Sequence, residues 1–425
     1  MAINKPAIVG VAGAMIARPA RLIAAIALFG GGAQAAPLTY DAALKLAETT
    51  APSLEARAAD VRASQRAAVA AGRLPDPKVL VEATDFPITG PLAGRPGQDD
   101  FSMLTLGFSQ EVPNVARRRA ARERAAANIG AAEVGERGEA RDVRVNTALA
   151  WINLYYAEHR LAVLNEIDRA LAPLRQTAAS RLASGAARPG ETLEPEQWTA
   201  ALADRRAGLV AEIGEARAEL VRWTGDAQAE VAGEPPDFPV DPAALHANLL
   251  RLPALTQYDA MERQADADVD AAKADKHPDW GFGVDYSHRD PRFGDYVSAK
   301  VTLSLPLFAS TRQDPIIDAR VETASRVRLE RTAKLRELEA SLDARLADHV
   351  MHHELLDRAQ NTLVPLAKQR ADLESASYGA GSASLSDVLS ALLALAEAQT
   401  NVVDHQADVA RDGAAIVLTY GDEAQ

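Results

Sequence analysis

The sequence predicts a mainly α-helical protomer, duplicated in tandem, with a smaller β-strand portion suited to a membrane β-barrel. Three observations predict this class. The same order of landmarks occurs twice along the 425 residues, each copy contains a very long helical pattern, and each copy contains two short runs that alternate apolar and polar residues. The composition agrees, because an alanine-rich chain with only 5% aromatic residues favours helices packed side by side.

The landmarks of the duplication keep a nearly constant spacing. Pro113 and Pro306 lie 193 residues apart, and Gly185 and Gly381, at breaks in the helical patterns, lie 196 residues apart. Self-similarity at one offset is the signature of repeated structural units. We therefore predict a helix, two strands and a long helix pair in each copy, with these bounds: a first repeat over 36–233, a proline-rich linker over 234–242 and a second repeat over 243–425.

Two stretches poor in proline predict unusually long helices. From Asn114 to Ser184 the pattern contains only Pro173, and at about 1.5 Å per residue such a helix is on the order of 100 Å long. A comparable pattern runs from Gln313 to Tyr378. Leucines on the a and d positions of one heptad frame predict coiled-coil packing, namely Leu335, Leu338, Leu342, Leu356, Leu363, Leu366 and Leu373.

Four runs with a period of two predict strands. Their apolar residues are Val79, Val81 and Ala83; Leu104, Leu106 and Phe108; Trp280, Phe282, Val284 and Tyr286; and Val297, Ala299, Val301, Leu303 and Leu305. Glu82, Asp285 and Lys300 fall on the opposite face, which would line a wet lumen. A soluble protein with two half-buried hairpins is the alternative interpretation.

A sheet in lipid has to close, because open edges leave backbone groups unpaired. Four strands cannot form a barrel, since the smallest common barrel has about eight. Three copies of this chain would supply twelve strands, so we predict a homotrimer with a 12-stranded barrel.

The N-terminus predicts export. A positive flank of Lys5, Arg18 and Arg21 accompanies the eight-residue apolar run Leu22 to Phe29, and Ala33-Gln34-Ala35 resembles a cleavage site. The run is shorter than the about 20 residues that span a bilayer, so a cleaved signal peptide over 1–35 is expected rather than an anchor. Because the chain has no cysteine, no lipid anchor is expected.

Composition and motifs argue against several other functions. A formal net charge of −13 disfavours nucleic acid as a partner, because phosphates repel an acidic chain. The sequence has no phosphate loop, nucleophile elbow or His-Glu-x-x-His motif, so neither an enzyme nor a cofactor is expected. His349, His352 and His353 are weak metal candidates, since helical spacing can present two imidazoles to one ion. A polar layer in the coiled coil is the commoner explanation, so we expect no metal site.

The stretch from Tyr378 to Ala391, with its Gly381-Ser382 break and Asp387-Val388-Leu389, resembles the tip of the TolC family of outer-membrane efflux proteins. The equivalent stretch of the first half, with Gly185-Ala186 and Glu191, is interrupted by Pro189 and Gly190. Duplication, four strands and two glycine breaks match the family as well. The resemblance implies a trimer whose barrel sits in outer-membrane lipid, above a long α-helical barrel that extends into the periplasm.

The same resemblance implies partners and site residues. A periplasmic adaptor (membrane fusion) protein would dock at the tips Gly185, Ala186, Gly381 and Ser382 and connect the passive duct to an inner-membrane pump. Asp387 would form a ring of three carboxylates that repel one another and attract cations, so it would act as gate and filter. Tyr378 would bond Glu191 in the closed state. Without the family, Asp387 is better explained as a helix cap, and the other two as solvated helix-end residues.

Three motifs most resemble the heavy-metal branch of the family, whose channels serve resistance-nodulation-division pumps for copper, silver, cobalt, zinc or cadmium. They are Leu74-Pro75-Asp76-Pro77, Asp85-Phe86-Pro87, and Gln110 to Asn114 with Arg117-Arg118-Arg119. We therefore expect a heavy-metal exit duct. A multidrug or type I secretion duct is the alternative within the family, and a soluble periplasmic coiled-coil adaptor or spacer is the alternative from another class.

Overall fold

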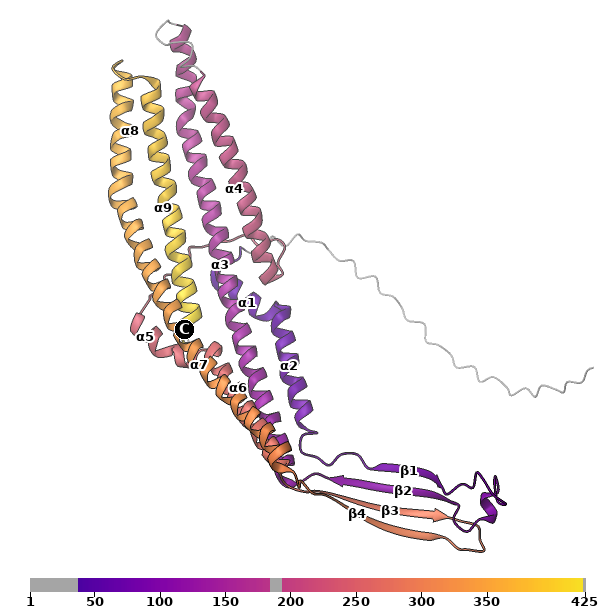
Figure 1. Cartoon of the computed structure of the whole chain (residues 1–425). Helices are drawn as coiled ribbons and strands as arrows, with labels where there is room; N and C mark the ends of the chain where they lie inside the picture. The colour runs from indigo at the N-terminus through magenta and orange to yellow at the C-terminus, as the bar shows by residue number, and fades with distance from the viewer. Residues whose placement is uncertain (1–36, 184–192, 423–425) are drawn as a thin grey trace, which may run out of the picture. The chain divides into compact units, whose positions relative to one another are not determined.

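The computed structural model describes residues 37–183 and 193–422, and the order of elements repeats (Figure 1). The first copy contains α1 (Tyr40–Thr50), α2 (Pro52–Ala68), β1 (Lys78–Thr84), the 3₁₀ turn η1 (Pro96–Gln98), β2 (Met103–Val112), α3 (Val115–Ala183) and α4 (Glu194–Thr224). The second contains α5 (Pro242–Asn248), η3 (Leu249–Arg251), α6 (Pro253–Ala274), β3 (Asp279–His288), β4 (Tyr296–Ser304), α7 (Ala309–Arg358), α8 (Val364–Gly379) and α9 (Leu385–Tyr420). The predicted tandem duplication and the mainly helical class are confirmed.

The two copies are not separate domains, since both belong to one compact unit that begins at Pro37. Helix α3 of the first copy packs against α6 and α9 of the second as well as against α4. The sheet lies near the end where α3 begins, and the α8–α9 turn lies toward its other end (Figure 1). Within the described residues, no helix has a stretch long and apolar enough to cross a bilayer.

Helix α3 has the predicted length. It contains 69 residues, which corresponds to about 100 Å at 1.5 Å per residue, and Pro173 lies inside it. Asn114 starts the helix, because its side-chain oxygen accepts a 2.8 Å hydrogen bond from the backbone N–H of Arg117. Such a cap satisfies one of the N–H groups that a helix leaves unpaired at its first turn.

The sequence predicts one long helix from Gln313 to Tyr378 in the second copy. The structure has two helices there instead. The first begins earlier, at Ala309, and a π-helical turn over Ala359–Leu363 separates α7 from α8. Pro365 is the second residue of α8, just after this turn. Proline has no N–H and its ring clashes with the carbonyl four residues earlier, so a regular helix cannot pass through it undisturbed. The wider π turn accommodates that disruption.

The core follows the helices and contains residues of both copies. Where α1, α3, α4 and α9 meet, Trp151, Leu154 and Leu220 are fully buried. The indole N–H of Trp151 donates a 2.8 Å hydrogen bond to the carbonyl of Leu38, which ties the segment before α1 to α3. Farther along α3, Leu164 and Ile167 pack with Leu202 of α4 and with Leu385, Leu389 and Ala396 of α9.

Packing of the heptad leucines differs along the helix. Leu338 and Leu342 of α7 are buried against α5, α6 and α9. By contrast, the last three leucines, Leu363, Leu366 and Leu373, are 46%, 58% and 60% exposed. Within a single chain these leucines therefore do not form one continuous buried seam, and the packing of the last three stays a prediction. In this region α9 is the helix packed against α8, so the other side of α8 has no cover among the described residues.

The linker between the copies lies against α9 at a glycine. A Cβ added to Gly413 would lie only 2.8 Å from the Cβ of Phe238, which is closer than carbon atoms approach. The Phe238 ring packs edge-on against Tyr40, with ring centroids 5.8 Å apart, and Tyr40 packs edge-on against Trp151. Because glycine has no side chain, the linker can pack against the core at Gly413.

Candidate functional site

The four strands form a single antiparallel sheet in the order β1-β2-β3-β4. The register pairs Val81 with Leu106, Leu106 with Tyr286, and Tyr286 with Val297. Side chains of directly paired residues point to the same face, so all the predicted apolar positions of the strands lie on one face of the sheet. The predicted alternation is therefore confirmed in all four strands, and β4 ends at Ser304 rather than at Leu305.

That apolar face is bare in the described chain. The large apolar residues along it are all exposed: Val79, Val81, Leu104, Leu106, Phe108, Trp280, Phe282, Val284, Tyr286, Val297, Val301 and Leu303. An exposed apolar surface of this extent marks a protein or membrane contact. The soluble interpretation expected the apolar face of the hairpins to be covered, and no residue in the described part of the chain covers it.

The other face is polar and internally paired. Thr105 of β2 and Ser287 of β3 are buried and share a 2.8 Å hydrogen bond between their hydroxyl oxygens. The Lys300 Nζ lies 3.8 Å from a carboxylate oxygen of Asp285, and a Cβ on Gly107 would lie 2.5 Å from the other. Two of the three predicted lumen residues, Asp285 and Lys300, thus form a charge pair on this face. The sheet has two open edges, β1 and β4.

The α8–α9 turn is specified locally at both of its ends. Gly381 has φ +80° and ends α8, because the N–H of Gly381 donates to the carbonyl of Tyr378 and the N–H of Ser382 donates to that of Ser377. These two bonds define the Schellman motif, whose left-handed residue is usually glycine. At the start of α9, Ser384 and Asp387 form a capping box, with reciprocal bonds of 3.0 and 3.1 Å.

The sequence suggested Asp387 as a cap, and the structure adds Ser384, which the Ser-x-x-Asp spacing could have identified. Asp387 is exposed, and hydrogen bonds from the Ser384 hydroxyl and N–H hold the pKa of its carboxyl below the ordinary value. The charge is thus retained at neutral pH. Capping and a ring of charges are compatible, because the carboxylate stays at the surface of the turn.

Tyr378 is half-buried and packs against the cluster that contains Leu385 and Leu389. Its predicted partner Glu191, and the first-half tip residues Gly185 and Ala186, lie outside the described residues. The Tyr378–Glu191 hydrogen bond therefore stays a prediction. Gly381 and Ser382 lie at the exposed end of the α8–α9 turn.

The three clustered histidines of α7 have different surroundings. The Nδ1 of His352 lies 2.6 Å from a carboxylate oxygen of Asp412 on α9, which is the polar pairing between helices that the seam position suggested. His349 is buried and His353 is exposed, with their ring centroids 4.6 Å apart. Among the described residues, no three His, Cys, Asp or Glu side chains are grouped so as to hold a metal ion.

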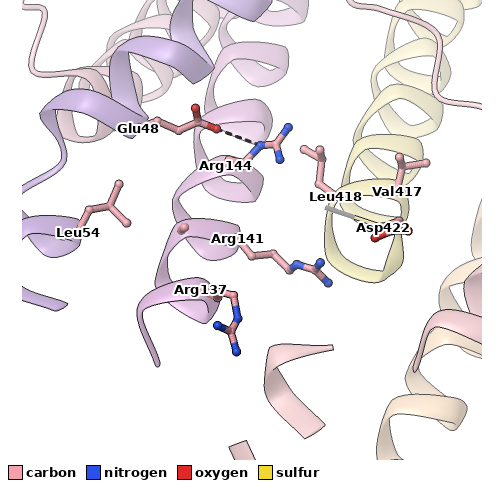
Figure 2. A pocket seen from close by; sticks show the side chains of 9 residues that line it. Glu48, Leu54, Arg137, Arg141, Arg144, Val417, Leu418 and Asp422 are labelled. Carbon is pink, nitrogen blue, oxygen red and sulfur yellow. Dashed lines mark ion pairs between the residues drawn. The ribbon is translucent and has the colours of Figure 1, made fainter. Parts of the chain in front are cut away.

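A cavity of about 320 Å³ lies between α2, α3 and the end of α9, and several arginines line it (Figure 2). Arg141 donates to the carbonyls of Thr419 and Gly421 at 2.9 and 3.3 Å, and the Nε of Arg144 lies 3.1 Å from Glu48 of α1. The last carbonyls of a helix have no partner within it and carry partial negative charge. Arg141 therefore anchors α3 to the end of α9, which is a structural role.

Of the three motifs that resemble the heavy-metal branch, two lie at the junction between strands and helices, and Asp85-Phe86-Pro87 follows the other end of β1. Asn114 donates from its backbone N–H to Asp279 at 2.7 Å, and Arg117 contacts both Asp275 and Asp279. The amide of Gln110 donates to the carbonyl of Pro75 at 2.8 Å. These residues hold β2, β3 and the adjoining helices together, so their contacts within the chain are structural.

Comparisons with known proteins agree with this geometry. The profile of the family described as outer membrane efflux protein matches residues 244–422. No curated protein matches the chain. Solved structures match it along its length, including a Pseudomonas aeruginosa membrane protein (15% identity, 90% of each chain covered, TM-score 0.78). The channel protein CusC (15%, 90% of this chain and 92% of that one, 0.76) and the Campylobacter jejuni outer membrane channel CmeC (14%, 90% and 85%, 0.76) match similarly.

At these identities the structural matches establish the fold, and the profile match adds a similarity to the family over residues 244–422. Channels of this family are passive ducts and not enzymes. Residues 244–422 therefore match the outer membrane efflux protein family model, and the chain as a whole has the TolC-like fold of solved outer-membrane channels.

Proposed function

We propose that three copies of this chain form the passive outer-membrane exit duct of a tripartite resistance-nodulation-division efflux system for heavy-metal cations. The observation that carries the duct is the open sheet, whose one face is apolar and bare and whose other face is polar and paired. The apolar face suits lipid, and the polar face suits a water-filled lumen.

Closure of the sheet is the reason for three copies. Edges β1 and β4 are unpaired in one chain, and lipid offers their backbone groups no hydrogen bonds. Edge pairing between neighbours closes a barrel of twelve strands. The exposed leucines Leu363, Leu366 and Leu373 support the same assembly, because α8 can complete its seam against a helix of the next copy.

The route to the membrane follows from the N-terminus. Residues 1–35 act as a cleaved signal peptide, and the repeats over 36–233 and 243–425 assemble after export, with the helices in the periplasm. Purification tests the class directly. We expect the mature chain to require detergent and to elute as a trimer. A monomer that stays dissolved in plain buffer would exclude the duct.

The metal substrate rests on the resemblance of the strand–helix junction to the heavy-metal branch. The test is complementation of a bacterial strain that lacks its own exit ducts. The strain expresses this chain together with the pump and adaptor encoded by the neighbouring genes. Restored growth on copper, silver, cobalt, zinc or cadmium salts supports the metal assignment. Restored growth on organic drugs alone, or restored protein secretion, assigns the duct to the multidrug or type I class instead.

The closed end carries the proposed gate. Three Asp387 carboxylates form the constriction, Tyr378 and Glu191 hold it closed, and the adaptor docks at Gly381-Ser382 and Gly185-Ala186. Two substitutions separate charge from capping in planar-bilayer recordings. Asp387→Asn removes the charge and retains an acceptor, so block by multivalent cations should weaken. Ser384→Ala removes the cap and retains the charge, so block at neutral pH should persist. Equal block in the wild type and in Asp387→Asn would contradict the assignment of Asp387 to the gate.

A further inference from the structure

We propose that His349 and His353 form a binding site for one borderline divalent transition-metal ion, such as Zn²⁺, Ni²⁺ or Cu²⁺, held by two imidazole nitrogens and completed by water. The two residues are four apart on α7, so they lie on the same face of the helix. Their rings are adjacent, with centroids 4.6 Å apart and planes at 89°. Imidazole nitrogen is a preferred ligand of these ions.

One ring nitrogen of His349 is unpaired and is available to bind a ligand. His349 is only 8% exposed, and its Nδ1 is buried with no hydrogen-bond partner among the described residues. Leaving a buried polar atom unpaired is costly, and unpaired atoms in native structures often mark a bound water or ion.

The pair faces a cavity large enough for a hydrated ion. The cavity has a volume of about 500 Å³ and lies among α3, the linker, α7 and α9. The linker contributes Glu234 and Asp237 to its wall, and α3 contributes Tyr155 and His159. Two carboxylates in the wall favour a cation there over an anion.

The third histidine of the cluster is excluded from the site. His352 already contacts Asp412, and it does not line the cavity. The protein thus supplies two ligands at this point, in agreement with the lack of any three-residue metal group among the described residues. Such a site binds through chelation by one helix. It lies on the chain itself, so it does not depend on which solute the duct exports.

Binding of ZnCl₂, NiCl₂ and CuCl₂ to the full mature protein in detergent, by equilibrium dialysis with metal analysis, tests the site. We expect one ion per protomer, and a Cu²⁺ paramagnetic resonance spectrum with nitrogen coupling from two imidazoles. His353→Ala should weaken binding by about tenfold or more, since it removes one of two chelating ligands. Its ring is exposed, so the substitution should leave folding intact. His349→Ala should have the same effect.

His352→Ala is the matched control, because it removes an imidazole one residue away that belongs to a different contact. It should leave binding unchanged. Binding that survives both His349→Ala and His353→Ala, that is lost only in His352→Ala, or that is absent from the wild type would overturn the site. The assay contains no pump or adaptor, so its failure is distinct from failure to export metal.

Discussion

A single charge placed on the apolar face of the sheet tests whether that face meets lipid. Val284 lies near the middle of β3, is 54% exposed, and is paired with Phe108 on one side and Ala299 on the other. An arginine at the middle of the lipid face of a barrel costs about 2–4 kcal/mol. Since each 1.4 kcal/mol is tenfold, Val284→Arg should lower the folded-to-unfolded ratio roughly 30- to 700-fold per protomer.

The matched control puts the same charge on the opposite face. Ser298 lies across from Asp285, so Ser298→Arg meets a carboxylate in the lumen and should change stability by no more than about 0.5 kcal/mol. Val284→Ala measures the loss of the side chain alone. The assay is folding into lipid vesicles across a guanidinium series, followed by tryptophan fluorescence. Equal costs for Val284→Arg and Ser298→Arg would refute the assignment of the two faces.

Three further results follow from local contacts. The hydrogen bonds from Ser384 favour the ionised carboxylate of Asp387 and so lower its pKa. Cation block should therefore be lost at a lower pH in the wild type than in Ser384→Ala. A midpoint of block that is the same in both proteins, measured by conductance titration, would contradict this. Gly413→Ala should cost about 1–3 kcal/mol because its Cβ meets Phe238, and much less in a Phe238→Ala background, as a double-mutant cycle by thermal denaturation would measure. Arg141→Ala should lower the free energy of unfolding by about 1–3 kcal/mol, because the carbonyls at the end of α9 lose their donors. Arg137 lines the same cavity and is exposed, so Arg137→Ala should change the free energy of unfolding by no more than about 0.5 kcal/mol.

Much of the fold could be predicted from local pattern. Period-two alternation gave all four strands and their faces, because the side-chain direction in a strand depends only on position along the chain. Glycine at 381 and the Ser384-x-x-Asp387 spacing specify both ends of the α8–α9 turn, since these motifs use backbone groups within a few residues. The proline-poor stretch after Asn114 likewise gave the length of α3.

What depended on distant partners could not be predicted. A heptad frame identifies Leu363, Leu366 and Leu373 as seam residues, but it does not say which chain supplies the other half of the seam. Sequence spacing also places the three histidines in one cluster. They differ because a carboxylate oxygen of Asp412, 60 residues beyond His352, lies 2.6 Å from the Nδ1 of His352. Pro365 predicts that the regular helix is interrupted. That the interruption takes the form of a π turn depends on the surrounding packing.

Cross-linking of the two sheet edges tests most directly whether three chains close one barrel. The chain has no cysteine, so Glu82→Cys in β1 combined with Lys300→Cys in β4 introduces the only pair. In one chain the two strands lie three strand spacings apart, about 14 Å, which is too far for a disulfide. Placing the second cysteine at Ser298 or Thr302 instead samples the neighbouring registers on the same face. We expect a covalent trimer after mild oxidation in at least one register, and a chain that stays monomeric in every register would contradict closure between protomers.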